Sequence, residues 1–250
     1  MKAVDEGLID LDTDINQYLD RVRIADEFPE PVTIRHLLTH TGGFDDSGSG
    51  RRTLDPTLME PLAEHLANFM PPRIHPPGEV LYYTNHQTTL ASLVLEDAAG
   101  VPFEEYARTH LFEPLGMTRT GFIRDLAPDG LVFGYTARRD GAYMPLEYTR
   151  TVASTMLATT AGDMARFLMM HLRNGRIGVT ALMGEAGVDA MHTQQFTNHP
   201  AVPGMAFGFY EMAVNGKRIL THGGGNDGAH GMIYLLPADD LAVFMAFNTD

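Results

Sequence analysis

Residues 207–248 read FGFYEMAVNGKRILTHGGGNDGAHGMIYLLPADDLAVFMAFN, and this stretch decides the fold class. Polar and apolar residues alternate at its start, as they do in a half-buried strand. The pair Asn215-Gly216 favours a two-residue hairpin turn, and residues 237–240 provide a second turn. The stretch therefore predicts an antiparallel meander of four strands at Phe207–Ala213, Arg218–Thr221, Gly231–Leu236 and Leu241–Asn248.

The residues before this stretch show the spacing of amphipathic helices, with capping residues and helix breakers at their ends. The predicted helices are Thr33–His40 with Thr33 as N-cap, Asp55–Phe69, Thr88–Ala99, Phe103–Phe112 closed by Pro114, and Asp163–Arg173 with Asp163 as N-cap. Helices followed by a terminal antiparallel sheet predict an α+β fold. We expect one domain over residues 1–250, helical over about 1–200 and β-structured over about 205–250.

The composition is that of an ordinary globular protein, with 250 residues of which 44% are hydrophobic and 20% charged. The absence of cysteine excludes a disulfide framework, a thiolate zinc site and a cysteine nucleophile. The net charge of -14 argues against nucleic acid or an anionic membrane surface as a partner. The longest apolar run, Leu241–Phe247, is far shorter than the ~18 residues of a membrane span, and Met1–Asp10 shows no signal peptide.

The glycine-rich segment His222–Gly228 has two familiar interpretations, and we reject both. From Gly223 to Gly228 it matches the G-x-G-x-x-G pattern of dinucleotide-binding proteins, but a strand pattern follows where that site needs a helix. It also matches the His-Gly-Gly-Gly loop of some α/β-hydrolases, which need a Gly-x-Ser-x-Gly motif. That motif is absent around all four serines, Ser47, Ser49, Ser92 and Ser154.

His36 and His40 stand four residues apart on a predicted helix, which is a spacing found in metal sites. Position 37 is leucine where a metalloprotease has its glutamate, and the sequence indicates no third ligand. The pattern favours structural histidines over metal ligands. We therefore expect neither a metal nor a cofactor.

Tyr83-Thr84-Asn85 follows a Pro-Pro-Gly-Glu turn and precedes a predicted helix. A tyrosine phenol has a pKa of about 10 and acts as a base only when a neighbouring cation lowers that pKa. The amide of an asparagine two residues further on can hold a substrate carbonyl and an ammonium group together. The pair is therefore suited to serve as a base and an orienting group.

Five segments occur in the order seen in one serine-hydrolase superfamily: Thr33–Phe44 (TIRHLLTHTGGF), Pro77–Asn85 (PGEVLYYTN), Glu113–Thr120 (EPLGMTRT), Ala161–Phe167 (AGDMARF) and His222–Gly224 (HGG). Together they make the chain resemble, over essentially its whole length, the class C β-lactamase-like group. This group contains D-alanyl-D-alanine carboxypeptidases, D-aminopeptidases and family VIII esterases. The resemblance implies a β-lactamase/penicillin-binding-protein-like fold and a covalent acyl-enzyme mechanism.

The resemblance also implies roles for residues at matching positions. Tyr83 would be the general base and later the general acid, and Asn85 would orient the substrate and the catalytic lysine. His222 would stand where the family has the lysine of Lys-Thr-Gly, on the strand beside the substrate. The same strand would carry the predicted substrate and oxyanion residues, Gly223, Gly224 and Gly225. In the oxyanion hole the donor would be the backbone N–H of Gly225.

The chain departs from the family at the nucleophile. The family uses a Ser-x-x-Lys motif, but neither of the two lysines here, Lys2 and Lys217, has a serine three residues before it. In the family that motif lies upstream of a segment that resembles Met1–Leu19. We therefore expect a serine hydrolase domain that is truncated at both ends and inactive by itself.

Two other interpretations stay open beside the truncated hydrolase. One is a binding module, or pseudo-enzyme, that keeps the substrate pocket without the nucleophile. The other is a hydrolase rebuilt around a metal or a different serine. Of the serines, Ser47 and Ser49 lie in a segment that looks more like a flexible turn, and Ser154 looks more like a packing residue.

The expected substrate is a small-molecule ester, lactam or D-amino peptide. Histidine at position 222 favours an ester or peptide, because a histidine with a pKa of about 6.5 is mostly neutral at pH 7 and holds a lactam carboxylate poorly. Self-association is also expected, since the strand Leu241–Asn248 is apolar on both sides and belongs in a covered sheet.

Overall fold

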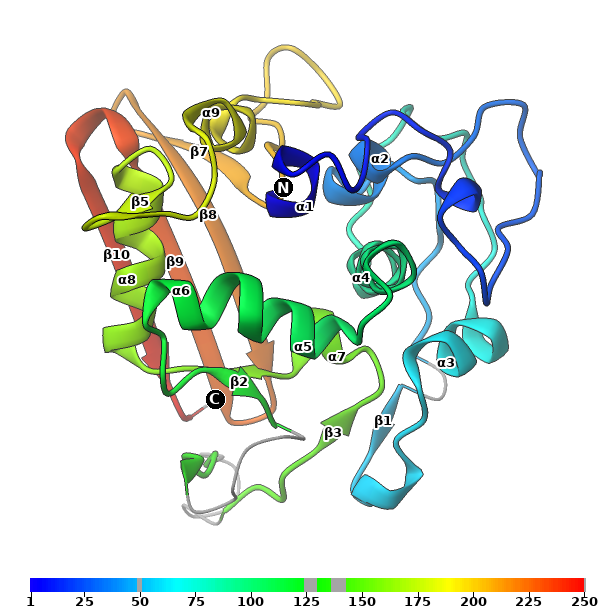
Figure 1. Cartoon of the computed structure of the whole chain (residues 1–250), viewed down its shortest axis with the longest axis horizontal. Helices are drawn as coiled ribbons and strands as arrows, with labels where there is room; N and C mark the ends of the chain where they lie inside the picture. The colour runs from blue at the N-terminus through cyan, green and yellow to red at the C-terminus, as the bar shows by residue number, and fades with distance from the viewer. Residues whose placement is uncertain (49–50, 124–129, 136–142, 250) are drawn as a thin grey trace.

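The computed structural model describes residues 1–48, 51–123, 130–135 and 143–249. Figure 1 shows a four-stranded sheet on one side of the molecule and a group of helices on the other. Helix α8 (Ala161–Leu172) lies against the sheet, and helix α4 (Asn85–Ala99) runs through the helical side. The short helix α1 (Lys2–Asp5) lies between the two sides.

The sheet is the antiparallel meander that the sequence predicts. Its strands pair in the order β10-β9-β8-β7, with bounds β7 (Tyr210–Val214), β8 (Lys217–Asn226), β9 (Ala229–Leu236) and β10 (Leu241–Phe247). The turn between β7 and β8 has a positive φ at both central residues, 51° at Asn215 and 75° at Gly216. Two-residue hairpins favour this geometry, which explains why an Asn-Gly pair identifies the turn.

Strand β8 is longer than the sequence predicted. The expected strand ended at Thr221, because glycine weakens a strand interior and three glycines follow His222. In the structure these glycines continue the ladder, since residues 223–225 pair with residues 230–232 of β9. His222 and the glycines therefore lie inside the strand, as the family resemblance implied, whereas the end of the strand predicted from the residue pattern was too early.

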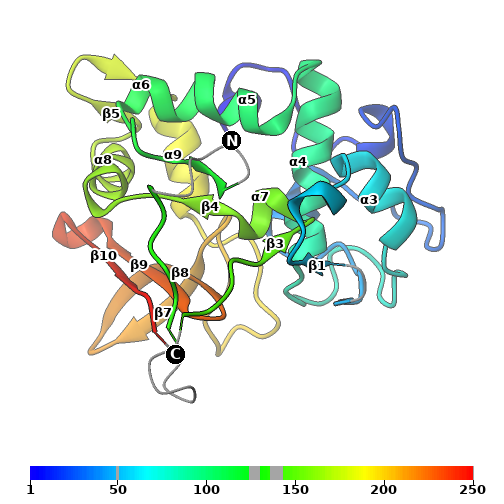
Figure 2. The same cartoon turned by 90° about the horizontal axis from the view of Figure 1, so that it is seen from below.

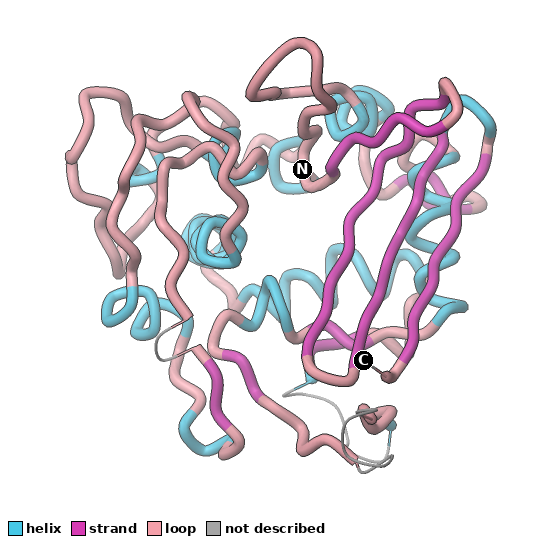
Figure 3. The backbone as a smooth tube through the Cα atoms, turned by 180° about the vertical axis from the view of Figure 1, so that it is seen from behind, coloured by secondary structure: helices cyan, strands magenta, loops and turns pink. Residues whose placement is uncertain are grey.

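Helix α8 covers one face of the sheet. Leu168 of the helix is buried with Leu220 of β8 and Leu235 of β9, and Phe244 of β10 packs against them. The other face of β10 carries four large side chains that are 39–54% exposed: Leu241, Val243, Met245 and Phe247. Figure 3 shows this face toward the viewer, and no helix of the described residues lies in front of it.

Helices α2 (Ile34–Leu38) and α4 begin at threonine caps. The Thr33 hydroxyl accepts the backbone N–H of His36, as the sequence predicts. For α4 the predicted start at Thr88 was three residues late, because the Thr84 hydroxyl already accepts the N–H of Gln87. The helix ends at Gly100, which has a φ of 69°.

The helix predicted over Asp55–Phe69 is divided. Residues Pro56–Leu58 form the 3-10 turn η2, and α3 starts only at Leu62 and ends at Phe69. Pro61 stands just before α3, at its N-cap. Proline has no N–H that could bond back to the preceding turn, so the helix is interrupted at Pro61. The spacing of the apolar residues gives no sign of this interruption.

The helix predicted over Phe103–Phe112 is also irregular. Helix α5 (Phe103–Ala107) continues as the π-helical segment η3 (Arg108–Phe112) and then as α6 (Glu113–Leu115). Pro114 was expected to close the helix, but it lies in the first turn of α6, where proline is tolerated. The true end is Gly116, with a φ of 69°.

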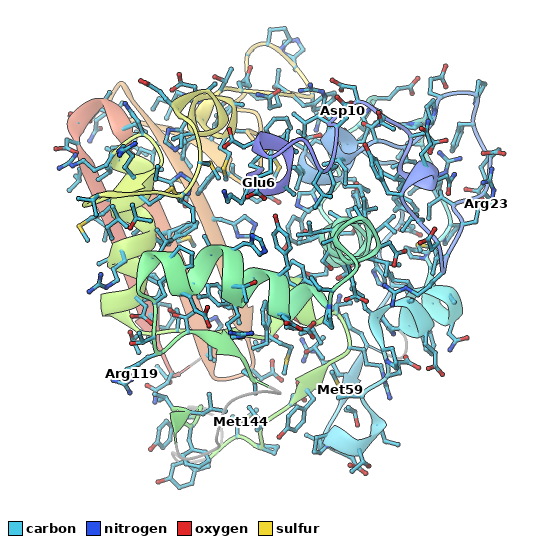
Figure 4. The ribbon with its side chains drawn as sticks, in the orientation of Figure 1. Glu6, Asp10, Arg23, Met59, Arg119 and Met144 are labelled. Atoms are coloured by element: carbon cyan, nitrogen blue, oxygen red, sulfur yellow. The ribbon has the colours of Figure 1, made fainter. Side chains whose placement is uncertain are left out.

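Asp163 is not the N-cap of its helix. The cap of α8 is Thr160, whose hydroxyl accepts the N–H of Asp163. The Asp163 carboxylate instead accepts the backbone N–H of Arg119, labelled in Figure 4, and the hydroxyl of Thr120, both at 2.8 Å. The residue therefore joins two segments that are far apart in the sequence.

Further short elements were not predicted. Among the described residues these are η1 (Ile15–Gln17), α7 (Val152–Thr155), α9 (Glu185–His192), η7 (Pro237–Asp239) and the strand pairs β1 (Arg52–Thr53) with β3 (Tyr148–Thr149), β2 (Gly121–Phe122) with β4 (Leu157–Ala158), and β5 (Arg176–Ile177) with β6 (Thr180–Ala181). Figure 2 shows β1 and β3 side by side, near α7. Across the described chain, every helix lacks the length or the apolar composition needed to cross a bilayer.

Candidate active site

The start of α4 is joined to the loop that follows α2 by the buried side chain of Gln87. Its Oε1 accepts the backbone N–H of Gly42 at 2.8 Å, and its Nε2 donates to the carbonyl of Tyr82 at 2.9 Å. The backbone N–H of Tyr82 donates in turn to the carbonyl of His40. These bonds fix the position of Tyr83, the next residue in the chain.

The Tyr83 ring and three neighbouring rings, those of His40, Tyr210 and His222, form what we call the ring cluster. The centroid of the Tyr83 ring lies 4.4 Å from that of His40, 6.1 Å from that of Tyr210 and 6.1 Å from that of His222. Tyr210 and His222 are themselves 5.7 Å apart. Tyr83 and His222, which are about 140 residues apart in the sequence, are thus neighbours where α4 begins and β8 passes.

Asn85 completes the group. It is the first residue of α4, and its side-chain oxygen accepts the Tyr83 hydroxyl at 3.3 Å. The structure therefore brings the three predicted catalytic residues, Tyr83, Asn85 and His222, close together. Their chemical roles stay a prediction.

The four rings are neutral near pH 7. Burial, followed by the charge of Asp46, raises the pKa of Tyr83, and Arg51 opposes this rise. Burial and then Tyr83 raise the pKa of Tyr210 to about 12. Burial lowers the pKa of His222, and burial together with His222 lowers the pKa of His40 to about 3.

The glycines of β8 differ in what surrounds them. A Cβ atom on Gly223 would lie 2.7 Å from Met232 Cε, and one on Gly225 would lie 2.6 Å from His230 Nδ1. A Cβ on Gly224 would meet nothing within 4 Å. Gly224 is two residues from His222, so both point to the same face of the strand. Open space therefore lies beside His222 on that face.

One backbone edge of β8 is also unpaired beside this space. Strand β7 pairs with β8 only from Lys217 to Thr221, whereas β9 pairs with it from Leu220 to Asn226. Within the described residues, the stretch from His222 onward has a strand on one side only. Backbone groups at such an edge can bind an extended substrate or a developing oxyanion.

Sequence reasoning missed two members of the ring cluster. Nothing singled out His40 as a neighbour of Tyr83, although both lie in segments that carry the family resemblance. Tyr210 could have been predicted from the hairpin. The two-residue turn at Asn215-Gly216 sets the register of the two strands, and this register pairs Tyr210 with Thr221, the residue before His222.

Other candidate residues have structural partners. The Ser92 hydroxyl donates to the carbonyl of Thr89, and that of Ser154 to the carbonyl of Thr151. Ser49 lies outside the described residues. The Nδ1 of His36 accepts the backbone N–H of Thr33. The described part of the chain holds no group of three or more histidines and carboxylates able to bind a metal.

A surface hollow of about 520 Å³ lies elsewhere, along the segment that precedes α2. It is not part of the ring cluster. Its lining residues are Asp14, Asn16, Ile24, Ala25, Asp26, Glu27, Phe28, Pro29, Glu30, Pro31, Val32 and Arg73.

Comparison with known proteins identifies the family. The Beta-lactamase family model matches residues 1–250, so the chain belongs to this family. The octameric penicillin-binding protein homologue from Pyrococcus abyssi shares the fold, with a TM-score of 0.81 and 24% identity over 99% of this chain and 58% of its own. The predicted superfamily and its β-lactamase/penicillin-binding-protein fold are thereby confirmed.

Curated relatives are similar over shorter segments. ML-236A carboxylate methylbutanoyltransferase of Penicillium citrinum is 30% identical in an alignment 156 residues long that covers 52% of this chain and 36% of that protein. Penicillin-binding protein 4 of Amycolatopsis lactamdurans is 27% identical in an alignment 198 residues long that covers 70% of this chain and 47% of that protein. The chain therefore spans less than half the length of these relatives.

Proposed function

We propose that this chain forms the part of an acyl-transfer site that contains Tyr83 and strand β8. The substrates of this site are small carboxylic esters or D-amino peptides. The observation that carries the proposal is the contact of the Tyr83 and His222 rings beside the open space at Gly224. A carbonyl group in that space would lie beside the unpaired edge of β8. Its oxygen would accept the backbone N–H of Gly225 as negative charge develops.

The reaction needs a proton donor as much as a base. When a nucleophile adds to the carbonyl carbon, the bond to the leaving oxygen or nitrogen breaks only if that atom gains a proton. Burial, and then Asp46, raise the pKa of Tyr83, so the phenol is protonated near neutral pH and has a proton to donate. Asn85 accepts the Tyr83 hydroxyl and keeps the ring in place.

We propose an ester or a D-amino peptide as the substrate, and not a lactam, because His222 is uncharged. Burial lowers the pKa of this histidine, so it carries no charge near pH 7 to hold the carboxylate of a lactam. The methylbutanoyltransferase relative supports an acyl group as the transferred unit. A pseudo-enzyme would keep the same binding site without turnover.

Binding at Gly224 tests the proposal. We expect N-acetyl-D-alanyl-D-alanine amide, which has no carboxylate, or a phenyl ester to shift the NMR signals of residues 222–225. The variant Gly224→Val should keep its melting temperature, because a side chain there meets nothing, and should lose these shifts. Shifts that survive in Gly224→Val, or that map to another surface, would contradict the proposed site. A fluorophosphonate adduct on Ser47, Ser49, Ser92 or Ser154 would instead support the alternative of a different nucleophile.

The open face of β10 leads to a second prediction, association with another copy of this chain. Val243 and Met245 lie there and are 39% and 44% exposed. The octameric homologue from Pyrococcus abyssi, which shares the fold, supports an assembly. Sedimentation at micromolar concentration should detect oligomers, and Val243→Asp should dissociate them.

Val179 provides the matched control, since it is 96% exposed outside this face. The variant Val179→Asp should sediment like the unchanged chain. If the unchanged chain is monomeric, or if both aspartate variants dissociate the oligomer equally, the β10 face is not the interface.

A further inference from the structure

Helix α2 is followed by a histidine with a left-handed backbone. His40 comes directly after the C-cap residue Thr39 and has a φ of 53°. Among the described residues, the other non-glycine residues with positive φ are Asn174, Asn215 and Asp240. Asparagine and aspartate tolerate this conformation, because their short polar side chains bond to the local backbone. A histidine ring at such a position carries a conformational strain that glycine would avoid.

The His40 side chain carries a second cost. It is buried, and its Nδ1 has no hydrogen-bond partner. Buried polar atoms are nearly always paired in folded proteins, and an unpaired one lowers the stability. Neither the strain nor the unpaired nitrogen is needed to end α2, since a glycine after the C-cap is enough for that purpose. The reason for a histidine therefore lies in what its ring contacts.

The His40 ring packs against the ring of Tyr83. The two centroids are 4.4 Å apart, and the ring planes meet at 51°. The rings of Tyr210 and His222 are more distant from Tyr83, each at 6.1 Å. The backbone carbonyl of His40 also accepts the N–H of Tyr82 at 2.8 Å. His40 thus holds the segment of Tyr83 twice, once through its backbone and once through its ring.

The bond to Asn85 holds only one end of the Tyr83 side chain. The hydroxyl donates to Asn85 at 3.3 Å, beyond the range of about 2.5–3.0 Å that is usual for O–H···O bonds. Tyr83 is also 37% exposed, so water competes for the hydroxyl. A bond at the oxygen leaves the ring free to turn about its own long axis. Because the O–H bond of a phenol lies in the ring plane, such a turn changes the direction in which the proton points.

We propose that His40 is a positioning residue that fixes the plane of the Tyr83 ring and thereby the direction of its O–H bond. The left-handed backbone after α2 turns the imidazole toward Tyr83, and the buried imidazole restrains the ring. The proton is then oriented before a substrate arrives, so no ordering of the ring is needed at the moment of reaction. The use of this proton rests on the proposed function, whereas the orientation of the ring is measured without substrate.

Fluorine NMR of the full chain with 3-fluorotyrosine at position 83 tests the proposal near neutral pH. A restrained ring gives a signal displaced from that of free 3-fluorotyrosine. His40→Asn should fold, because asparagine tolerates the positive φ, and should lose most of this displacement. His40→Phe keeps a ring beside Tyr83 and should retain the displacement, although it keeps the strain. A merely structural role predicts instead that the signal follows the stability of each variant.

His65→Asn is the matched control. His65 is also fully buried with an unpaired nitrogen, but its ring contacts Phe69 and His86, so its loss should lower the stability and leave the fluorine signal unchanged. A displacement that survives in His40→Asn, that disappears in folded His40→Phe, or that falls equally in His65→Asn overturns the proposal.

If His40→Asn does not fold, His40→Gly replaces it with the same expected loss, because glycine adopts a positive φ freely. If His40→Phe does not fold, the comparison of His40→Asn with His65→Asn decides. Failure of substrates to bind at Gly224 contradicts the proposed function alone and has no effect on these signals.

Discussion

Replacing Gly43 by alanine is expected to destabilise the fold by at least about 3 kcal/mol, more than most single substitutions do. Gly43 has a φ of 81°, and a Cβ atom there would lie 1.9 Å from the carbonyl oxygen of His75. That oxygen belongs to the backbone and cannot rotate away. The Gly43 carbonyl also accepts the N–H groups of Ile74 and His75, so the two segments cannot separate without losing both bonds.

Gly100 is the matched control for this prediction. Its φ of 69° is similarly left-handed, but a Cβ atom would meet nothing within 4 Å. Gly100→Ala should therefore cost only the conformational strain of about 1–2 kcal/mol. Urea unfolding of both variants measures the difference. Equal losses of stability would show that the contact between Gly43 and His75 does not determine the effect.

Local backbone chemistry is the part of the fold that the sequence predicts well. The caps at Thr33 and the Asn215-Gly216 turn were correct, because each depends on residues within four positions of one another. The errors had the same local origin. Pro61 divides a helix whose apolar spacing is continuous, and Thr84 and Thr160 cap earlier than the residues chosen.

The site depends on contacts that no local pattern contains. The sequence suggested Tyr83 through its chemistry with Asn85 and His222 through resemblance to a family, but nothing in either segment specifies a ring 6.1 Å away. The residue pattern ended the strand at Thr221, but pairing with β9 continues it through the glycines after His222.

Buried histidines are expected to make the protein lose stability in mild acid. His171 of α8 and His192 of α9 share a hydrogen bond between Nδ1 and Nε2 at 3.1 Å, which requires one neutral ring to accept from the other. Phe167 and Phe209 enclose His171 with edge-on contacts. Burial, and then His192, lower the pKa of His171 to about 3.

The direction of the effect follows from proton linkage. A histidine has a pKa of about 6.5 in the unfolded chain, so between pH 6.5 and 3 the unfolded state binds a proton that folded His171 does not. The free energy of unfolding therefore falls as the pH decreases through this window. His40, with its pKa of about 3, acts in the same direction. From pH 6.5 to 4.5 each histidine should remove about 2 kcal/mol, and the two together about 4 kcal/mol.

Urea unfolding at pH 7, 6, 5 and 4.5 measures this slope, and most of the window lies above the range in which carboxylates titrate. The variant His171→Gln keeps a hydrogen-bonding group beside His192 but removes the titration. This variant should be less stable at pH 7. Between pH 6.5 and 4.5 its free energy of unfolding should fall by about 2 kcal/mol less than that of the unchanged chain. A slope that is the same with and without His171 would mean that this ring binds a proton in the folded protein, and that the α8–α9 contact tolerates the charge.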